Sequence, residues 1–150
     1  VITTYTRRWR IEDFHRSWKR GGCHVERNQL RSANAVVKWA TLNAVVAARI
    51  ERLKHIARNT PDEPATIEFT RTELEALRIL KEEQKKRTET LAPGVPSIAV
   101  ATRWVADLGG YVGARSSGPP GATVIGRGLE HLEIATAAIA AYKADRKKMR

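Results

Sequence analysis

The residues with the clearest chemical potential lie close together near the start of the chain. On a helix that turns by about 100° per residue, four side chains fall within an arc of roughly 60°: Tyr5, Arg8, Glu12 and Lys19. Arginine and lysine neutralise backbone phosphates, and a glutamate offers a hard oxygen ligand to Mg²⁺ or Mn²⁺. Two cations beside one carboxylate therefore suit a phosphate-binding site that also uses a divalent metal.

The same spacing has an ordinary structural explanation. Arg8 and Glu12 are four residues apart, and such pairs form ion pairs on the surface of many amphipathic helices. The opposite side of this helix carries three apolar residues that we expect to pack: Ile11, Phe14 and Trp18. Spacing alone leaves both interpretations open.

The four polar residues form the pattern Y-x2-R-x3-E-x6-K. This pattern resembles the signature of bacterial cut-and-paste DDE transposases, and within them the insertion-sequence-four group, to which the transposase of transposon five belongs. Further short motifs, in the same order along the chain, also resemble that group: R-W-x-I-E-x-F-H at 8–15, G-C-x-V-E-R at 22–27, L-G-G-Y at 108–111, and P-G at 120–121 followed by R-G-L at 127–129. The resemblance thus extends over nearly the whole chain.

The resemblance implies two-metal phosphoryl transfer, in which two Mg²⁺ (or Mn²⁺) ions about 4 Å apart activate a water or a DNA 3′-hydroxyl and stabilise the leaving oxygen. Three carboxylates are needed, two Asp from an RNase H-like sheet and one Glu from a following helix. Glu12 matches the third, as catalytic residue and metal ligand. Tyr5, Arg8 and Lys19 match positions that hold DNA phosphate, and Arg16 lies on the same face. The family's two Asp lie upstream of this chain.

Positive charge is concentrated in the first third of the chain. The net charge is +11; residues 1–58 hold 13 Lys/Arg against 4 Asp/Glu, a net +9, whereas residues 59–150 hold 14 against 12, a net +2. This asymmetry indicates a polyanionic partner, and nucleic acid fits it, although RNA or an acidic membrane surface would give the same signal.

Cysteine content and hydropathy indicate the compartment. Cys23 is the single cysteine, which excludes an internal disulfide and suits a reducing environment. No apolar run approaches the roughly 20 residues of a membrane span. We therefore expect a cytoplasmic protein with no membrane partner, and the resemblance implies that it is bacterial and nucleoid-associated.

Apolar periodicity and capping signals predict a mainly α chain. The expected helices cover residues 5–19 with a stop at Gly21-Gly22, 28–58 with Ser32 as a local interruption, 70–86 opened by a Thr70–Glu73 capping box, 97–108, and 123–148. The middle of the second helix is apolar nearly all round, which predicts burial and a core position for Trp39. The remaining β-rich stretch, residues 65–69, is too short to build a sheet.

Two units are predicted on either side of the Pro-containing stretch 59–64. By the resemblance, residues 1–58 are the C-terminal helices of an RNase H-like catalytic domain, and residues 65–150 are a helical C-terminal domain of the dimerisation type. The last helix bears a stripe that suits a partner helix: Leu129, Leu132, Thr136, Ile139 and Tyr142. The family usually carries a large aromatic at the position of Gly126 and an acid near Ser117, so the chain departs from the pattern there.

Together these features predict the C-terminal fragment of a DNA transposase. The lack of a starting Met also indicates a fragment. It would bind transposon-end double-stranded DNA and form a homodimer through its C-terminal helices. One carboxylate cannot hold two cations in a reactive geometry, so Mg²⁺ or Mn²⁺ would act only in the intact enzyme. The alternative is a non-enzymatic helical DNA-binding or dimerisation relic that forms a heterodimer with intact transposase and inhibits it.

Overall fold

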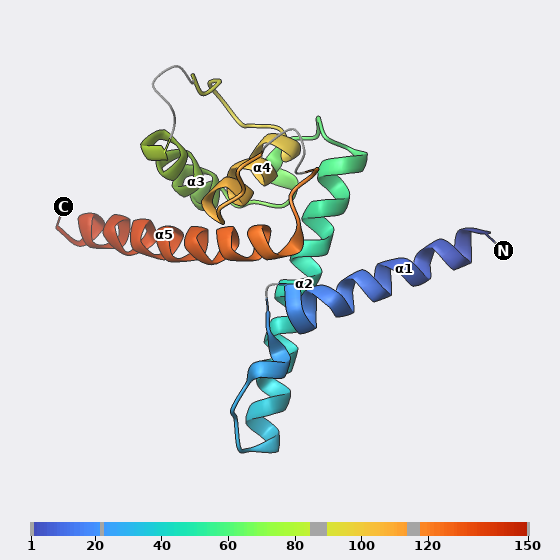
Figure 1. The fold of residues 1–150 in the computed structure, drawn as a ribbon. Helices are drawn as coiled ribbons and strands as arrows, with labels where there is room; N and C mark the ends of the chain where they lie inside the picture. Colours follow the sequence, from blue (N-terminus) through green and yellow to red (C-terminus); the bar gives the residue numbers. More distant parts are fainter. Residues whose placement is uncertain (1, 22, 85–89, 114–117, 150) are drawn as a thin grey trace.

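The computed structural model describes residues 2–21, 23–84, 90–113 and 118–149, with the backbone alone for residues 2–7 and for Lys147 (Figure 1). Within these ranges the chain forms helices and no β-strand, which confirms the mainly α prediction. The five α-helices are α1 (Ile2–Arg16), α2 (Ala33–Asn59), α3 (Arg71–Gln84), α4 (Ile98–Leu108) and α5 (Ala122–Lys148). Three short helices join them: η1 (Ser17–Gly21), η2 (Val25–Arg27) and η3 (Ala65–Ile67). None of the described helices is long and apolar enough to cross a membrane.

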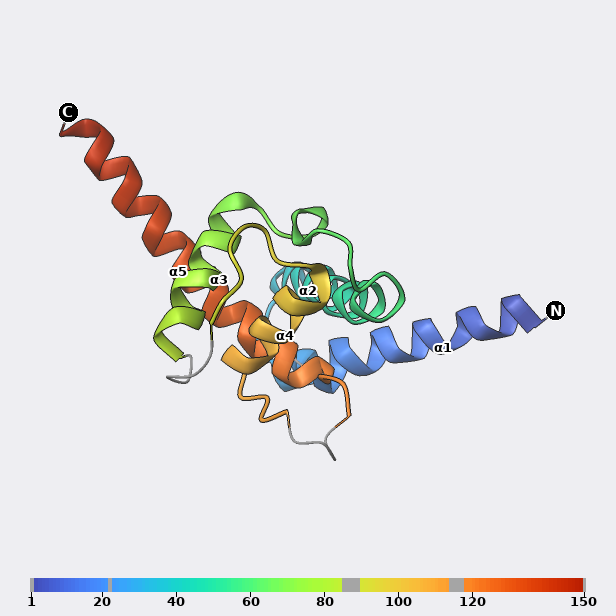
Figure 2. The ribbon, with the colours of Figure 1, turned by 90° about the horizontal axis from the view of Figure 1, so that it is seen from above.

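One hydrophobic core lies between the second half of α2 and helices α3, α4 and α5. Its largest fully buried side chains come from all four helices: Ile50, Leu53, Leu77, Ile98, Val105, Ile125 and Leu132. Helix α1 and the C-terminal part of α5 extend away from this core in opposite directions (Figures 1 and 2), so the two ends of the chain lie on opposite sides of the molecule.

Two glycines let α4 and α5 pack closely. A Cβ atom on Gly128 would lie 1.8 Å from the carbonyl oxygen of Val105, and one on Gly109 would lie 1.8 Å from that of Val124. Because backbone meets backbone at these points, no larger residue fits without moving the helices apart. The glycines thus set the distance at which the apolar faces of α4 and α5 meet.

The helix starts predicted for α3 and α4 are confirmed. The backbone N–H of Thr70 donates to Glu73 Oε2 at 2.7 Å, and that of Glu73 donates to Thr70 Oγ1 at 3.2 Å, a complete capping box. Ser97 Oγ accepts from the N–H of Val100 at 3.4 Å at the start of α4. The predicted end of α3 near residue 86 lies outside the described residues, as do Gly22 and Ser117.

The predicted start and burial of α2 were wrong. The helix begins at Ala33 with Ser32 as its N-cap, after a 3-10 turn, so Ser32 precedes the helix instead of interrupting it. Trp39 is 40% exposed and not in the core, and the neighbouring Leu42 is 66% exposed. Periodicity identifies the apolar faces of a helix, but none of the described segments covers all of those faces in the first half of α2.

Two further expectations need correction, and a third, that residues 65–69 build no sheet, is confirmed. Ile11 is exposed, while Phe14 and Trp18 are half-buried, so only part of the predicted apolar side of α1 packs. The β-rich stretch 65–69 contains a 3-10 turn. In α5, Leu129 and Leu132 are buried in the chain's own core, whereas Tyr142 is exposed. The first part of the predicted α5 stripe is therefore occupied within the chain.

Residues 59–64, predicted to separate two units, are tied to the start of α4. The carbonyl of Glu63 accepts from the N–H of Ile98 at 2.7 Å, and that of Pro61 accepts from Ala99 at 3.2 Å. The core itself contains Ile50 and Leu53, which precede this stretch. These contacts hold the second half of α2 against the helices that follow it.

Candidate nucleic-acid interface

Helix α1 presents Arg8 and Glu12 side by side on an exposed face. The helix already runs at Tyr5, because it begins at Ile2, but the side chain of Tyr5 lies outside the described residues. Arg8 Nε donates to Glu12 Oε1 at 3.3 Å, and the two side chains are 69% and 43% exposed. The structure thus brings together the central cation and carboxylate of the predicted motif.

The other two predicted cations lie beside different carboxylates. Arg16 Nη1 lies 3.1 Å from Asp13 Oδ1, and Lys19 Nζ lies 3.6 Å from Glu26 Oε1. All of these side chains are well exposed, and such surface ion pairs contribute about 0–1 kcal/mol. A phosphate could therefore replace either carboxylate at little cost.

The position of Lys19 depends on a π-helical turn that follows α1 directly, η1. Its Ser17 is buried, and the Ser17 hydroxyl donates to the Glu51 carboxylate of α2. Glu51 also accepts from Lys54 Nζ at 2.7 and 2.8 Å. A π turn advances by less than 100° per residue, so Lys19 does not follow the angle that a regular helix predicts.

Sequence analysis did not identify Ser17 or Glu51 as functional residues. The two are 34 positions apart, and no local pattern links them. Trp18 Nε1 adds a second tie, donating to the carbonyl of Ala40 at 3.0 Å. Together these bonds fix the end of α1 on the middle of α2, and so determine where the motif points.

Glu12 fits as one ligand of a divalent metal but not as a complete site. Arg8 engages Oε1 alone, and Glu12 Oε2 has no hydrogen bond to any described residue. Across the described parts of the chain, no group of three or more His, Cys, Asp or Glu residues could hold a metal. The remaining ligands of a two-metal site would have to come from outside the described residues.

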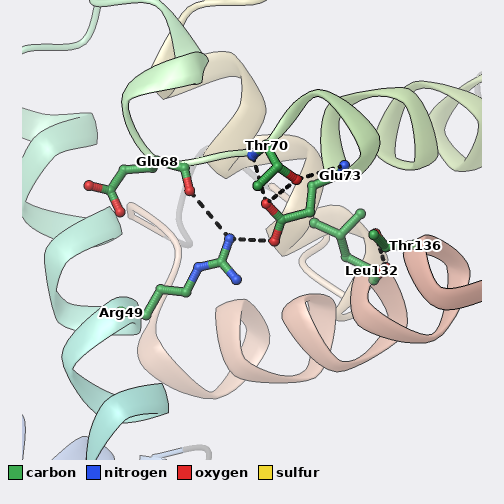
Figure 3. Close-up of polar contacts among 6 residues, drawn as sticks. All are labelled: Arg49, Glu68, Thr70, Glu73, Leu132 and Thr136. Carbon is green, nitrogen blue, oxygen red and sulfur yellow. Dashed lines mark hydrogen bonds and ion pairs between the residues drawn. The ribbon is translucent and has the colours of Figure 1, made fainter. Parts of the chain in front are cut away.

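A second polar network links the middle of α2 to the start of α3 (Figure 3). Arg49 Nη2 donates to Glu73 Oε1 at 2.7 Å and to the carbonyl of Glu68 at 3.4 Å. Burial alone would raise the pKa of Glu73, but hydrogen bonds from Thr70 and Arg49 outweigh it, and the pKa is lowered. This network holds α2 against α3 and belongs to the packing of the core.

Two family models match the chain in consecutive ranges. One, described as "Transposase DDE domain", matches residues 1–48. The other, described as "Transposase Tn5 dimerisation domain", matches residues 45–147, which is 103 of the 150 residues.

The chain belongs to the Tn5-type transposases. The resemblance carried by the sequence motifs is confirmed. A DDE domain implies that the intact enzyme uses a divalent metal, and a dimerisation domain supports the formation of a homodimer. The exposed Arg8 and Glu12 fall in the part that matches the DDE model.

The two matched ranges meet inside a helix of this transposase chain. They overlap at residues 45–48, in the interior of α2. No loop separates the part that matches the catalytic domain from the part that matches the dimerisation domain. The two parts are therefore joined by continuous helical backbone, and also by side-chain contacts such as that of Ser17 with Glu51.

Proposed function

We propose that this chain is the C-terminal part of a DDE transposase that acts on transposon-end double-stranded DNA. Residues 1–58 would be the last helices of its RNase H-like catalytic domain, and residues 65–150 its helical dimerisation domain. Glu12 supplies the third metal-binding carboxylate, for Mg²⁺ or Mn²⁺. The phosphates of the DNA are held by the remaining residues of the motif face: Tyr5, Arg8, Arg16 and Lys19.

The exposed Arg8–Glu12 pair carries this proposal. Among the described residues, neither side chain makes another hydrogen bond or ion pair. A pair of this kind contributes little to folding, so both groups are available to a ligand. The surrounding residues 1–58 hold a net charge of +9, which suits a phosphate backbone.

Each residue has a distinct part in the proposed chemistry. Bound divalent cations activate the attacking oxygen and stabilise the leaving oxygen. Arg8 orients the Glu12 carboxylate through Nε, and its outer nitrogens are free to bind a phosphate oxygen. Lys19, placed by the π turn, neutralises a second phosphate.

Binding of a transposon-end duplex, measured over a series of salt concentrations, tests the DNA contact. Arg8→Ala with Lys19→Ala should weaken binding to all sequences and make the plot of log affinity against log salt shallower by roughly 1 to 2. Arg71→Ala with Arg127→Ala removes the same charge from exposed sites outside residues 1–58 and is the matched control. If the motif variant kept the wild-type slope, Arg8 and Lys19 would not be phosphate ligands.

A cleavage assay tests the role of Glu12. The isolated chain should neither nick nor join transposon-end DNA in Mg²⁺ or Mn²⁺, because one carboxylate cannot hold two cations in place. Metal-dependent nicking that Glu12→Ala abolished would overturn this expectation. In a full-length transposase that contains this chain, Glu12→Ala should abolish cleavage while leaving DNA binding intact.

We propose that the homodimer forms through the exposed part of α5. Ile134 and Tyr142 on this helix are 66% and 64% exposed, and Figure 1 shows α5 extending past the core.

Ile134→Asp should lower self-association in sedimentation over a concentration series, with Ile67→Asp in η3 as control. Leu132→Asp is unsuitable, because Leu132 is 1% exposed and supports the core. Association without DNA should be micromolar at best, since binding must offset several kcal/mol of lost freedom. A monomer at all concentrations, also with DNA, would contradict this role.

The alternative, a non-enzymatic module that pairs with intact transposase, is favoured by the lack of a complete metal site among the described residues. Added in excess, such a module would form heterodimers and inhibit transposition. Inhibition by the wild-type chain, lost in Ile134→Asp and retained in Glu12→Ala, would identify this function.

A further inference from the structure

We propose a second phosphate-binding site, between α1 and the second half of α2, in which Arg10 and Arg58 bind the DNA backbone. The site rests on the proposed function for its ligand, but it lies apart from the Arg8–Glu12 face. Arg10 follows Arg8 by two residues, which is about 200° around the helix. The two arginines therefore point to opposite sides of α1.

A pocket of about 500 Å³ occupies this position. Arg10 and Asp13 line it from α1, and Arg52, His55 and Arg58 line it from α2. The pocket opens to solvent, because Arg10, His55 and Arg58 are all exposed. A phosphate group can thus enter without any rearrangement of the helices.

The charges of the pocket are not balanced. Both of its carboxylates are engaged: Glu51 bonds to Ser17 and Lys54, and Asp13 pairs with Arg16 at 3.1 Å. Arg52 is paired as well, with Glu68. Two guanidinium groups remain, because among the described residues neither Arg10 nor Arg58 has a carboxylate partner.

The contacts of Arg10 keep it turned towards the pocket. Its Nη2 lies 3.1 Å from Nε2 and 3.3 Å from Nδ1 of His55. Since a guanidinium can only donate, a ring nitrogen of His55 accepts here, and Asn59 Nδ2 also approaches His55 Nδ1, at 2.7 Å. This arrangement fixes one nitrogen of Arg10 and leaves the others for a ligand.

Arg58 has an ordinary structural explanation too. It lies in the last turn of α2, where a positive charge interacts favourably with the helix dipole. That interaction is worth less than about 1 kcal/mol at an exposed position, and it does not explain why Arg10 faces the same pocket.

Two planar, always-charged groups around one cavity match the geometry of a phosphate. Among the described residues that line the pocket, Asn59 is the one amide and none is Trp, Tyr or Phe, so the contact would be independent of sequence.

The test compares three double variants of the full chain by fluorescence anisotropy with a labelled transposon-end duplex over a salt series. Arg10→Gln with Arg58→Gln should make the salt slope shallower by roughly 1 to 2. Arg8→Gln with Lys19→Gln reports on the motif face, and Arg71→Gln with Arg127→Gln is the charge-matched control. A slope in the pocket variant equal to that of the control overturns the second site, whatever the motif variant does.

The same set separates the two proposals. A shallower slope in the pocket variant, together with a wild-type slope in the motif variant, would support the second site and contradict the proposed role of Arg8 and Lys19. Arg10→Lys with Arg58→Lys restores the charge and should restore most of the slope, and failure to do so would contradict the phosphate contact. Urea unfolding of each variant excludes a folding defect as the cause.

Titration with inorganic phosphate without DNA distinguishes the source of the ligand. For a DNA-backbone site, millimolar phosphate should bind weakly and no differently to the wild-type chain and the pocket variant. Saturable phosphate binding that the pocket variant loses would instead identify a site for a free anion, and would overturn assignment to the DNA backbone.

Discussion

Large apolar side chains in the two halves of α2 have opposite environments. Leu42 and Leu53 are the same residue type and lie 11 positions apart, which places them on the same face of the helix. Leu42 is 66% exposed and Leu53 is fully buried. The change occurs around residues 45–48, where the match to the DDE domain gives way to the match to the dimerisation domain.

This difference shows that burial along α2 depends on which segments are present to cover it. The second half is covered by α3, α4 and α5, and Arg49 ties it to the start of α3. The first half carries large apolar side chains that the described segments leave exposed: Val37, Trp39, Leu42, Val45 and Val46. Where exposed apolar side chains form a continuous patch, that patch is typically an interaction site.

The largest expected effect is the contrast between Leu53→Ala and Leu42→Ala. Leu53→Ala removes a fully buried side chain and should lower the free energy of unfolding by about 2–5 kcal/mol. Leu42→Ala, at an exposed position of the same face, should change it by less than about 0.5 kcal/mol. Urea unfolding followed by circular dichroism measures both. A loss above 1 kcal/mol for Leu42→Ala would mean that the first half of α2 also packs in this chain.

A smaller, pH-dependent effect is expected for Glu73→Gln, which weakens the contact that holds the second half of α2 to α3. At pH 7 the loss in unfolding free energy should be about 1 kcal/mol, the usual size for a helix cap. The folded-state pKa of Glu73 is lowered, so its contribution is present above the unfolded pKa of about 4.3. It is lost as the pH falls through the lower, folded pKa.

The difference between wild-type and Glu73→Gln chains should therefore be full at pH 7 and shrink below about pH 4. Denaturant unfolding at a series of pH values measures it. A difference that stayed constant down to pH 3 would show that ionisation of Glu73 does not contribute.

The smallest effect on stability is expected for Leu42→Ser with Val45→Ser. The unfolding free energy should stay within about 0.5 kcal/mol of wild type, while binding of a hydrophobic dye should fall, because these side chains form part of the exposed apolar surface. Val112→Ser, at an isolated position that is 88% exposed, is the control and should leave dye binding unchanged. Equal dye binding in all three chains would argue against a continuous surface on α2.

Local signals in the sequence predicted much of the fold. The Thr70–Glu73 capping box and the apolar periodicity placed α3, α4 and α5 close to their observed bounds. These features depend on residues three or four positions apart, so they can be found without a structure. The domain boundaries at residues 58 and 65 stay a prediction.

What depends on distant partners could not be predicted. The exposure of Trp39 depends on the segments that are present to cover it, and periodicity carries no such information. In the π turn, Ser17 bonds through its hydroxyl to Glu51, which lies 34 positions away in the sequence. Similarly, Arg8 and Glu12 could be placed together from their spacing, but the ion pair of Lys19 with Glu26, seven positions apart, could not. The roles of the motif residues in binding DNA and metal stay predictions.

The continuity of α2 also has a mechanical consequence. At about 1.5 Å per residue its 27 residues form a strut about 40 Å long. Near the middle of this strut, Ser17 and Trp18 clamp the base of α1 to Glu51 and Ala40. If the helices packed around the second half of α2 rotate, α1 therefore rotates with them. A tilt of about 10° would move a point 20 Å along α1 by roughly 3.5 Å, about one residue's extended length, so a dimer that set the orientation of α2 would thereby aim Arg8 and Glu12.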